Sequence, residues 1–165
     1  LIQIAALSYG LYSIAQARPA WIAFNNDRFE LVRNNELKTE NITHAQPQYQ
    51  QPTWLQPQYV AVKQAADPQE QQIEQMSAML NGISLALYPE RYIPLNQVQE
   101  QMKIKAHDLP ELNQWNAKVA VQQVLKVYPE ANAWLPLETY GLAMVILVNK
   151  ETAEVIKIVD LRPWN

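Results

Sequence analysis

The 165-residue chain contains no cysteine, which excludes disulfides, iron–sulfur clusters, cysteine-ligated zinc and cysteine nucleophiles. Its three glycines are too few and too scattered for a phosphate-binding loop or a dinucleotide fingerprint. Charge is also scarce: 13 Lys and Arg face 16 Asp and Glu, for a net charge of −3. Nucleic-acid binding requires clustered positive charge, so we expect no nucleic-acid partner.

Neutral amides take the place of charge on the surface. The sequence has 19 Gln and 12 Asn, together more than its 29 charged residues. Such a surface is well hydrated but produces weak long-range fields, so we expect little electrostatic steering of ligands. The length is ordinary for a single domain with its own hydrophobic core.

The chain begins with an uncharged, largely apolar run over residues 1–17, followed by Arg18. Sixteen helical residues span about 24 Å, less than the roughly 30 Å hydrocarbon core of a bilayer. The run lacks the basic start of a signal peptide. It is therefore either the end of a longer transmembrane helix or an amphipathic helix packed on its own domain. Tyr9, Tyr12 and Trp21 near its end are typical of a membrane interface.

Two strands and a proline-rich segment follow. Short β-rich runs flank Asn25, Asn26 and Asp27, residue types that tolerate a positive φ, so we predict a tight hairpin there. Residues 34–43 are predicted to be a loop. Residues 46–59 carry a proline every five positions, which favours extended chain. This segment is either a docking strand that exposes Tyr49, Trp54 and Tyr59, or a loop whose aromatic residues fold back onto the core, and the cost of an exposed Trp favours the loop.

The middle of the chain is predicted to be helical. Asp67, Pro68 and Glu70 form a helix start, and Gly82 supplies its end. The methionines of this region are expected to fill the core. Further helices are predicted to start at Asn96 and at residues 108–111, the second running as one element to a point before Pro129.

The C-terminal third returns to strands. Residues 131–135, 142–148 and 155–159 are apolar and β-rich, with a polar turn at 149–154. The order of hairpin, helices and hairpin predicts an α+β domain with a mainly antiparallel sheet, built from N- and C-terminal hairpins, and helices packed on one face.

No group of residues predicts catalysis. His44 and His107 lack a second ligand at metal-binding spacing, and no serine lies in a nucleophile elbow. Carboxylate pairs such as Glu70 and Glu74 are typical of a solvated helix face. The segments Asp27-Arg28 and Asp160-Leu161-Arg162 are candidates for ion pairing across two hairpins, as a structural feature before a catalytic one. We expect no cofactor and no bound metal.

Two motifs resemble the TfpX/TfpZ-type type IV pilin accessory proteins. The first resembles that family's apolar "Q-x-A-A-L-x-Y-G-L-Y" helix end, its "A-R-P-x-W/Y" and its "F-x-x-D-R-F". The matching residues are Gln3, Ala5, Ala6, Leu7, Tyr9, Gly10, Leu11, Tyr12, Ala17, Arg18, Pro19, Trp21, Phe24, Asp27, Arg28 and Phe29. The second is the tail over residues 145–164, although the family's usual Thr-Gly turn is Thr152-Ala153 here. The motifs bracket the chain, while its Gln-rich middle matches little.

The resemblance implies an inner-membrane protein with a periplasmic domain and no enzymatic activity. Residues 1–17 would be the end of a transmembrane helix and residues 18–165 a single periplasmic domain. It would contact type IV pilin or the inner-membrane assembly platform and modulate pilus extension or retraction. The candidate residues of an anchor region beside the membrane are Arg18, Trp21, Asp27, Arg28, Arg162 and Trp164. The alternative, which is slightly favoured over direct pilin contact, is that they only hold the two hairpins together where the helix enters the domain. The alternatives are a periplasmic enzyme that modifies pilin and a membrane-anchored sensor module.

Overall fold

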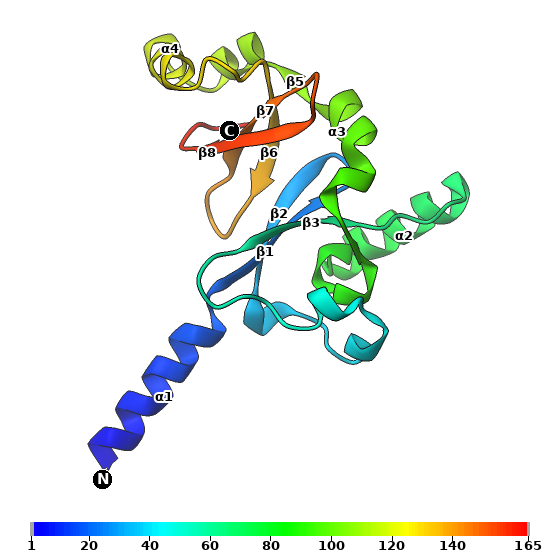
Figure 1. The fold of residues 1–165 in the computed structure, drawn as a ribbon, viewed down its shortest axis with the longest axis vertical. Coiled ribbons are helices and arrows are strands. Elements are labelled where there is room, and N and C mark those ends of the chain that lie inside the picture. The colour runs from blue at the N-terminus through cyan, green and yellow to red at the C-terminus, as the bar shows by residue number, and fades with distance from the viewer. Residues whose placement is uncertain (1, 165) are drawn as a thin grey trace. The chain divides into compact units, whose positions relative to one another are not determined.

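A computed structural model describes residues 2–164, so Leu1 of the predicted membrane run lies outside the described residues. The chain has an α+β fold in which helices accompany a mostly antiparallel sheet, as the sequence predicts (Figure 1). The α-helices are α1 (Ile2–Gln16), α2 (Pro68–Asn81), α3 (Gln99–Lys105) and α4 (Lys118–Val127). The strands are β1 (Pro19–Asn25), β2 (Arg28–Arg33), β3 (Gln58–Val62), β4 (Tyr92–Ile93), β5 (His107–Asp108), β6 (Ala133–Glu138), β7 (Met144–Asn149) and β8 (Glu154–Val159). The short 3-10 helices are η1 (Asn34–Glu36), η2 (Ile42–His44), η3 (Pro47–Tyr49), η4 (Leu85–Leu87), η5 (Pro89–Arg91), η6 (Leu95–Val98) and η7 (Leu109–Gln114).

The described residues form two compact units that share the β1–β2 hairpin. Unit 1 contains the chain up to Ala23 and the segment Leu31–Ile93, and unit 2 contains Phe24–Glu30 and the chain from Pro94 onward. The predicted hairpin is confirmed: Asn26 has φ +63°, which Asn tolerates better than most residues. The hairpin's open end thus belongs to unit 1 and its turn to unit 2.

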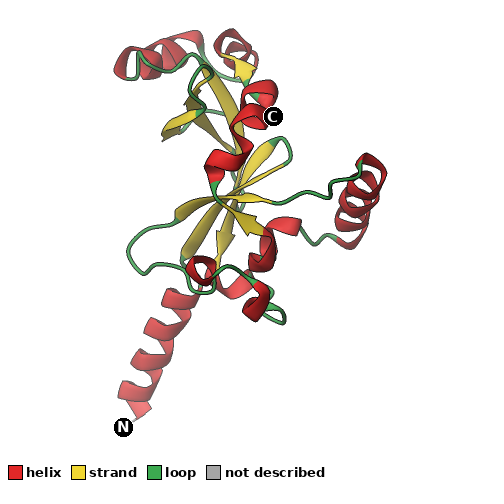
Figure 2. Ribbon diagram, turned by 45° about the vertical axis from the view of Figure 1, so that its right-hand side comes forward, coloured by secondary structure: helices red, strands yellow, loops and turns green. Residues whose placement is uncertain are grey.

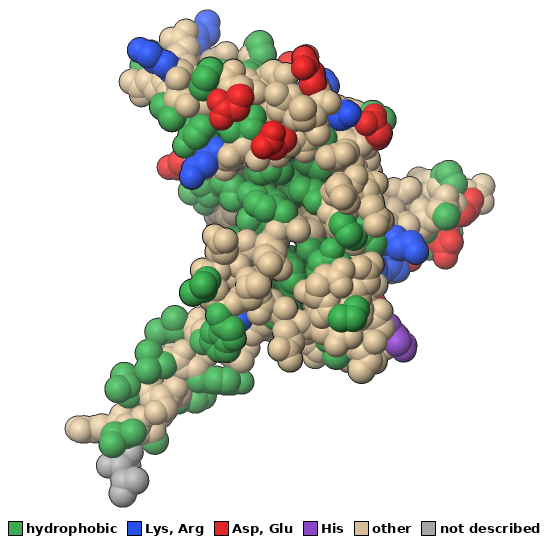
Figure 3. Space-filling model, viewed as in Figure 1, with side chains coloured by type: hydrophobic (Ala, Val, Ile, Leu, Met, Phe, Trp, Pro, Cys, Tyr) green, Lys and Arg blue, Asp and Glu red, His purple; other side chains and the backbone are tan. Residues whose placement is uncertain are grey.

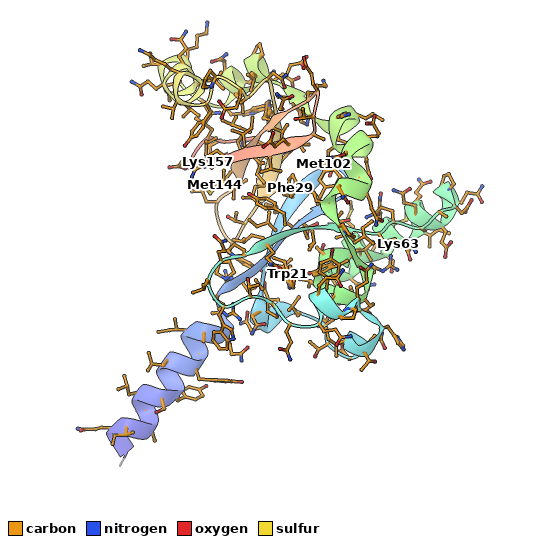
Figure 4. All side chains as sticks on the ribbon, viewed as in Figure 1. Trp21, Phe29, Lys63, Met102, Met144 and Lys157 are labelled. Carbon is orange, nitrogen blue, oxygen red and sulfur yellow. The ribbon has the colours of Figure 1, made fainter. Side chains whose placement is uncertain are left out.

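Unit 1 contains strands β4, β3 and β1 in that order, with β3 and β4 antiparallel. Its core is aromatic: Trp21 of β1 makes edge-to-face contacts with Tyr49 and Tyr92, at ring-centre distances of 5.8 and 5.4 Å. The Tyr92 hydroxyl donates a 2.5 Å hydrogen bond to the carbonyl of Ala86, which satisfies the one polar atom of that ring. Figure 4 shows Trp21 within the cluster of side chains beneath β1.

Helix α2 begins and ends where the sequence predicts. The Asp67 side chain accepts a hydrogen bond from the Glu70 amide at 3.0 Å, and Pro68 occupies the first turn. Gly82 ends the helix in the left-handed conformation, with φ +64°. Helix α2 projects from the strands of unit 1 (Figure 1 and Figure 2).

Unit 2 is built on strands β2, β6, β7 and β8 in that order, with β5 paired to the start of β6. The β6–β7 and β7–β8 pairs are antiparallel, whereas β2 and β6 are parallel and place Phe29 opposite Leu137. Val121 of α4 and Leu112 of η7 pack in one hydrophobic cluster with Trp134 and Leu147. One face of this part of the sheet is thereby covered by helices.

The prediction of one continuous helix from residue 108 towards Pro129 is wrong. The segment forms η7 and then α4, separated at residues 115–117. Asn116 lies in the break, where its side-chain nitrogen donates to the carbonyls of Leu112 and Arg162, both at 2.8 Å. Its side-chain oxygen accepts from the Arg162 amide at 2.8 Å. These tertiary hydrogen bonds compete with a continuing helix.

The two predicted loops contain single turns of 3-10 helix. Residues 34–43 include η1 and the start of η2, and residues 46–59 include η3 before β3 begins at Gln58. Three-residue turns of this kind tolerate proline at their first position, as at Pro47. The rest of the proline-rich segment has no regular secondary structure until β3.

The turn between β7 and β8 predicts the effect of one substitution. Ala153 has φ +58°, a conformation that costs an L-residue roughly 1–2 kcal/mol. Glycine avoids this cost but loses about 0.5–1 kcal/mol in unfolded-state entropy. We therefore expect Ala153→Gly to raise the free energy of unfolding by about 0.5–1 kcal/mol, measured by urea denaturation. Ala131→Gly is the control, because Ala131 is equally buried without a positive φ, and it should destabilise. A destabilised Ala153→Gly protein would contradict this account of the turn.

Candidate functional site

Helix α1 exposes an uncharged surface along its length. It contains no Asp, Glu, Lys or Arg, and Figure 3 shows mostly hydrophobic side chains on the face in view. Its exposed large hydrophobic residues are Ile4, Leu7, Tyr9, Leu11, Tyr12 and Ile14. Ile4, Leu7, Leu11 and Ile14 follow one another at i, i+3, i+7 and i+10 and form one apolar stripe, while Tyr9 and Tyr12 lie outside it. No helix within residues 2–164 combines the length and the hydropathy that crossing a bilayer requires.

The end of α1 contacts the proline-rich loop through Arg18. Arg18 donates a hydrogen bond through Nη1 to the carbonyl of Thr53, and its guanidinium lies 4.6 Å from the centre of the Trp54 ring. Trp54 is 76% exposed and Leu55 is 97% exposed. We call residues 53–56 the loop tip. The structure thus brings together one residue of the predicted anchor region and one of the predicted docking loop.

The other residues of the predicted docking loop differ in burial. Tyr49 is buried against Trp21, so both lie in the core of unit 1. Tyr59 is partly exposed on β3, and burial of its ring raises the pKa of its hydroxyl. Of the three aromatic residues, Trp54 therefore presents the largest exposed fraction.

The remaining predicted anchor residues lie in unit 2. The Arg28 guanidinium donates to the Asp27 carboxylate at 3.0 Å and to Glu138 at 3.5 Å, and the hydrogen bond to Asp27 is the main cause of its raised pKa. It also lies 5.4 Å from the centre of the Trp164 ring. The C-terminal tail and the first hairpin therefore meet at Arg28 and Trp164.

Arg162 makes contacts within its own tail and turn. It pairs with Asp160 and donates to the carbonyl of Ala143 at 2.9 Å. Asp27–Arg28 and Asp160–Arg162 thus pair within their own segments, and Arg28 also pairs with Glu138 of β6. The cation–π contact of Arg28 with Trp164 joins the two segments. Exposed pairs of this kind contribute little stability.

The apolar face of helix α2 points away from the rest of its unit, whereas a helix that covers a core turns its apolar face inward. Ile73, Met76 and Leu80, at i, i+3 and i+7, are exposed, as is Met79 beside them. We call these four residues the α2 stripe. The prediction that the methionines fill the core is wrong for Met76 and Met79, which are 56% and 82% exposed.

The inner face of α2 is held by polar contacts. Arg91 donates to both oxygens of the Glu74 carboxylate, at 2.9 and 2.5 Å, and Gln75 donates to the Gln64 side chain at 3.5 Å. This bidentate hydrogen bonding is the main cause of the lowered pKa of Glu74 and the raised pKa of Arg91. The polar contacts of the inner face leave the α2 stripe directed outward.

A pocket of about 440 Å³ lies between α2 and residues 83–91, and it includes Ser77, Glu74, Glu90 and Arg91 in its lining. Both oxygens of Glu74 are engaged by Arg91, so its carboxylate is ionised and occupied rather than poised as a general base. Glu90 accepts a 3.2 Å hydrogen bond from Asn41. The pocket holds no histidine in its lining, and Ser77 is hydrogen-bonded to Asn81 at 3.2 Å.

His107 lies outside this pocket. Its Nδ1 is 3.2 Å from Glu111 and its ring stacks on Trp134 with ring centres 4.6 Å apart. Cross-strand pairing of β5 with β6 explains this placement, because His107 and Trp134 are register partners. Within residues 2–164, no cluster of three or more His, Asp or Glu side chains is arranged to hold a metal ion.

Sequence reasoning missed the two most exposed apolar features of unit 1. The predicted docking loop names Trp54 but not the neighbouring Leu55, and the methionines of α2 are predicted to face the core although they are exposed. A sequence signal existed for α2: its inner positions are Gln71, Glu74 and Gln75, whose polarity is unusual for a buried face.

The geometry defines an α+β protein with an exposed apolar helix and an outward-facing apolar stripe. The chain is similar to the fimbrial assembly protein of serogroup I from Dichelobacter nodosus, with 26% identity over 143 residues. It is also similar to the serogroup E1 protein of that organism, with 24% identity over 143 residues. Each match covers 82% of this chain and 55% of the relative, so the chain spans about half the length of the curated relatives it matches. No family model matches the chain. No solved structure matches it.

The Glu74–Arg91 pair predicts a pH-dependent stability. Because the folded state lowers the pKa of Glu74 below its ordinary 4.5, the stabilisation is present above that value and is lost as the pH falls through the lowered pKa. We expect Glu74→Gln to cost about 1 kcal/mol near neutral pH, and this difference should shrink in acid. Urea denaturation across this pH range measures it. Glu100→Gln, which breaks the exposed pair with Lys103, should change little. A Glu74→Gln cost that is independent of pH would contradict the role of the ionised pair.

Proposed function

We propose that this chain is a non-catalytic accessory protein of type IV pilus assembly, acting through contact with pilin or with the inner-membrane assembly platform to modulate pilus extension and retraction. Two observations support it: the similarity to fimbrial assembly proteins over 82% of the chain, and the two motifs at its ends that resemble pilin accessory proteins. Because the relatives are about twice as long as the matched part, the activity of the whole protein is part of this proposal.

We propose that α1 is embedded in the inner membrane as the end of a membrane helix, with the following residues in the periplasm. The support is the absence of charge along α1 and the exposure of its large apolar side chains. An isolated apolar helix in water would leave these side chains unburied, whereas lipid surrounds them without cost.

The observation that carries the contact role is the outward direction of the α2 stripe. A helix that binds its own unit through Glu74 and Gln75 presents Ile73, Met76 and Leu80 to a second molecule. A narrow apolar row at i, i+3 and i+7 fits one apolar helix or strand of a partner. The stripe carries no charge, so an uncharged segment of a pilin subunit is the occupant that we propose.

The α2 stripe is tested by Met76→Glu with Leu80→Glu. Both side chains are exposed, so folding should be retained, while charge on the stripe should weaken the capture of pilin at least tenfold. Capture of purified pilin by the immobilised chain measures the effect. In cells, the double variant should change the number of pili and the twitching motility in the same direction as deletion of the gene.

The matched control is Val119→Glu, which places the same charge on an exposed apolar residue of α4 in unit 2. It should leave pilin capture unchanged. Undiminished capture by the double variant would exclude the α2 stripe as the pilin contact. A deletion strain with normal pili and normal motility would overturn the accessory function itself, and loss of capture of a platform protein alone would move the contact from pilin to the platform.

A further inference from the structure

The chain at the end of α1 is held by two hydrogen bonds, one of which joins it to the loop tip. Asn34, just after β2, donates to the side-chain oxygen of Gln16 in the last turn of α1 at 2.6 Å. Arg18, the second residue after the end of α1, donates to the carbonyl of Thr53. The tip therefore lies within the reach of a single side chain from the point where α1 enters unit 1.

The loop tip is also pre-shaped to display two apolar side chains. The Thr53 hydroxyl donates to the carbonyl of Gln56 at 2.6 Å, which closes a turn around Trp54 and Leu55. Pro52 and Pro57 flank this turn and restrict its backbone. The Arg18 guanidinium against the Trp54 ring restrains that ring without covering most of it. Because the tip is already ordered, inserting it into a membrane or binding it to a partner would cost little conformational entropy.

The charge pattern around the tip matches a phospholipid surface. Residues 41–62 contain no Asp, Glu, Lys or Arg, and neither do residues 2–17. Arg18 directly follows the first of these segments and contacts the second at Thr53 and Trp54, so its charge lies where lipid phosphates would meet it. Trp is enriched at membrane interfaces because its ring is apolar and its N–H is polar, and Leu partitions below it.

We infer that Trp54 and Leu55 insert into the interface of the bilayer that holds α1, forming a second membrane contact that fixes the tilt of unit 1 on the membrane. This inference rests on the proposed embedding of α1. A single helix end leaves the attached unit free to rotate about the helix axis, whereas a second contact beside it removes that freedom. The occupant of the tip is a phospholipid surface rather than a protein.

The test uses the whole chain bound to vesicles of phosphatidylethanolamine and phosphatidylglycerol that carry brominated acyl chains, which quench nearby tryptophans. The other tryptophans are Trp21, Trp115, Trp134 and Trp164, of which Trp21 and Trp134 are buried. We expect Trp54→Phe to remove more than half of the quenched emission while the chain remains bound. Trp115→Phe, at a tryptophan packed against Trp134, is the matched control and should leave the quenched emission nearly unchanged.

A second variant keeps the test independent of removing the fluorophore. Leu55→Asp should reduce the quenching of Trp54 at least twofold, because a carboxylate opposes insertion of the tip. Leu80→Asp, the same change at an exposed leucine of α2, should not reduce it.

The outcomes separate the two proposals. If the chain binds the vesicles but Trp54 is not quenched, the loop tip is not a membrane contact, while the embedding of α1 stands. If the chain does not bind the vesicles at all, both are overturned. If Trp54 is unquenched and Leu55→Asp instead weakens the capture of pilin, the tip is a protein contact and this inference is wrong.

Discussion

Both units depend on one β-hairpin. Trp21 and Val32, from its two strands, lie in the aromatic core of unit 1, whereas Phe24 and Phe29, nearer its turn, contact each other in unit 2 with ring centres 5.2 Å apart. The same short element therefore supplies the largest buried side chain of one core and a pair of rings to the other. Its register is set by the turn at Asn26, since a shift by one residue would exchange the two faces of each strand. A hairpin with this double role explains why an aromatic, β-rich segment directly follows α1.

The local signals in the sequence predicted the elements that are stabilised locally. The hairpin turn follows from Asn26 and Asp27, and α2 follows from its Asp67 cap and its Gly82 end, because each is decided by contacts within a few residues. The β7–β8 hairpin followed from apolar runs around a polar turn. The missing glycine there was visible in the sequence, and the positive φ of Ala153 is its structural consequence.

The failures have a different origin, since each depends on a partner distant in the chain. Asn116 ends one helical segment because it binds the backbone of Arg162, which lies 46 residues away. The direction of α2 is decided by Arg91 and Gln64, which hold its polar face, so the usual inference that apolar residues face the core fails. The candidate site was predicted only in part. Local patterns named Arg18 and Trp54 separately, but their contact depends on the fold, which places one against the other.

The scarcity of charge determines which kinds of contact this surface can make. The ion pairs Arg28–Asp27, Arg162–Asp160 and Lys103–Glu100 join residues one to three positions apart. Arg28–Glu138, Arg91–Glu74 and Lys150–Asp108 join residues distant in the chain, so much of the scarce charge is already paired within the protein. Long-range attraction between the surface and a partner is correspondingly weak. Recognition is left to apolar side chains and amides, and unit 1 carries both of the apolar surfaces proposed here, the α2 stripe and the loop tip.

The proposed membrane attachment would strengthen the proposed contact of the α2 stripe. Complete burial of a side chain such as Ile, Leu or Met stabilises by about 1.5–3 kcal/mol, so four of them supply about 6–12 kcal/mol. Association of two free molecules costs about 4–15 kcal/mol in lost translation and rotation. A stripe of this size alone therefore gives a weak complex in solution. If α1 and the loop tip hold unit 1 in one orientation on the same membrane as its partner, much of that loss occurs before the contact forms, and the effective concentration rises. Under these proposals the contact forms readily at the membrane and remains weak enough to release, as the proposed action on a growing and retracting pilus requires.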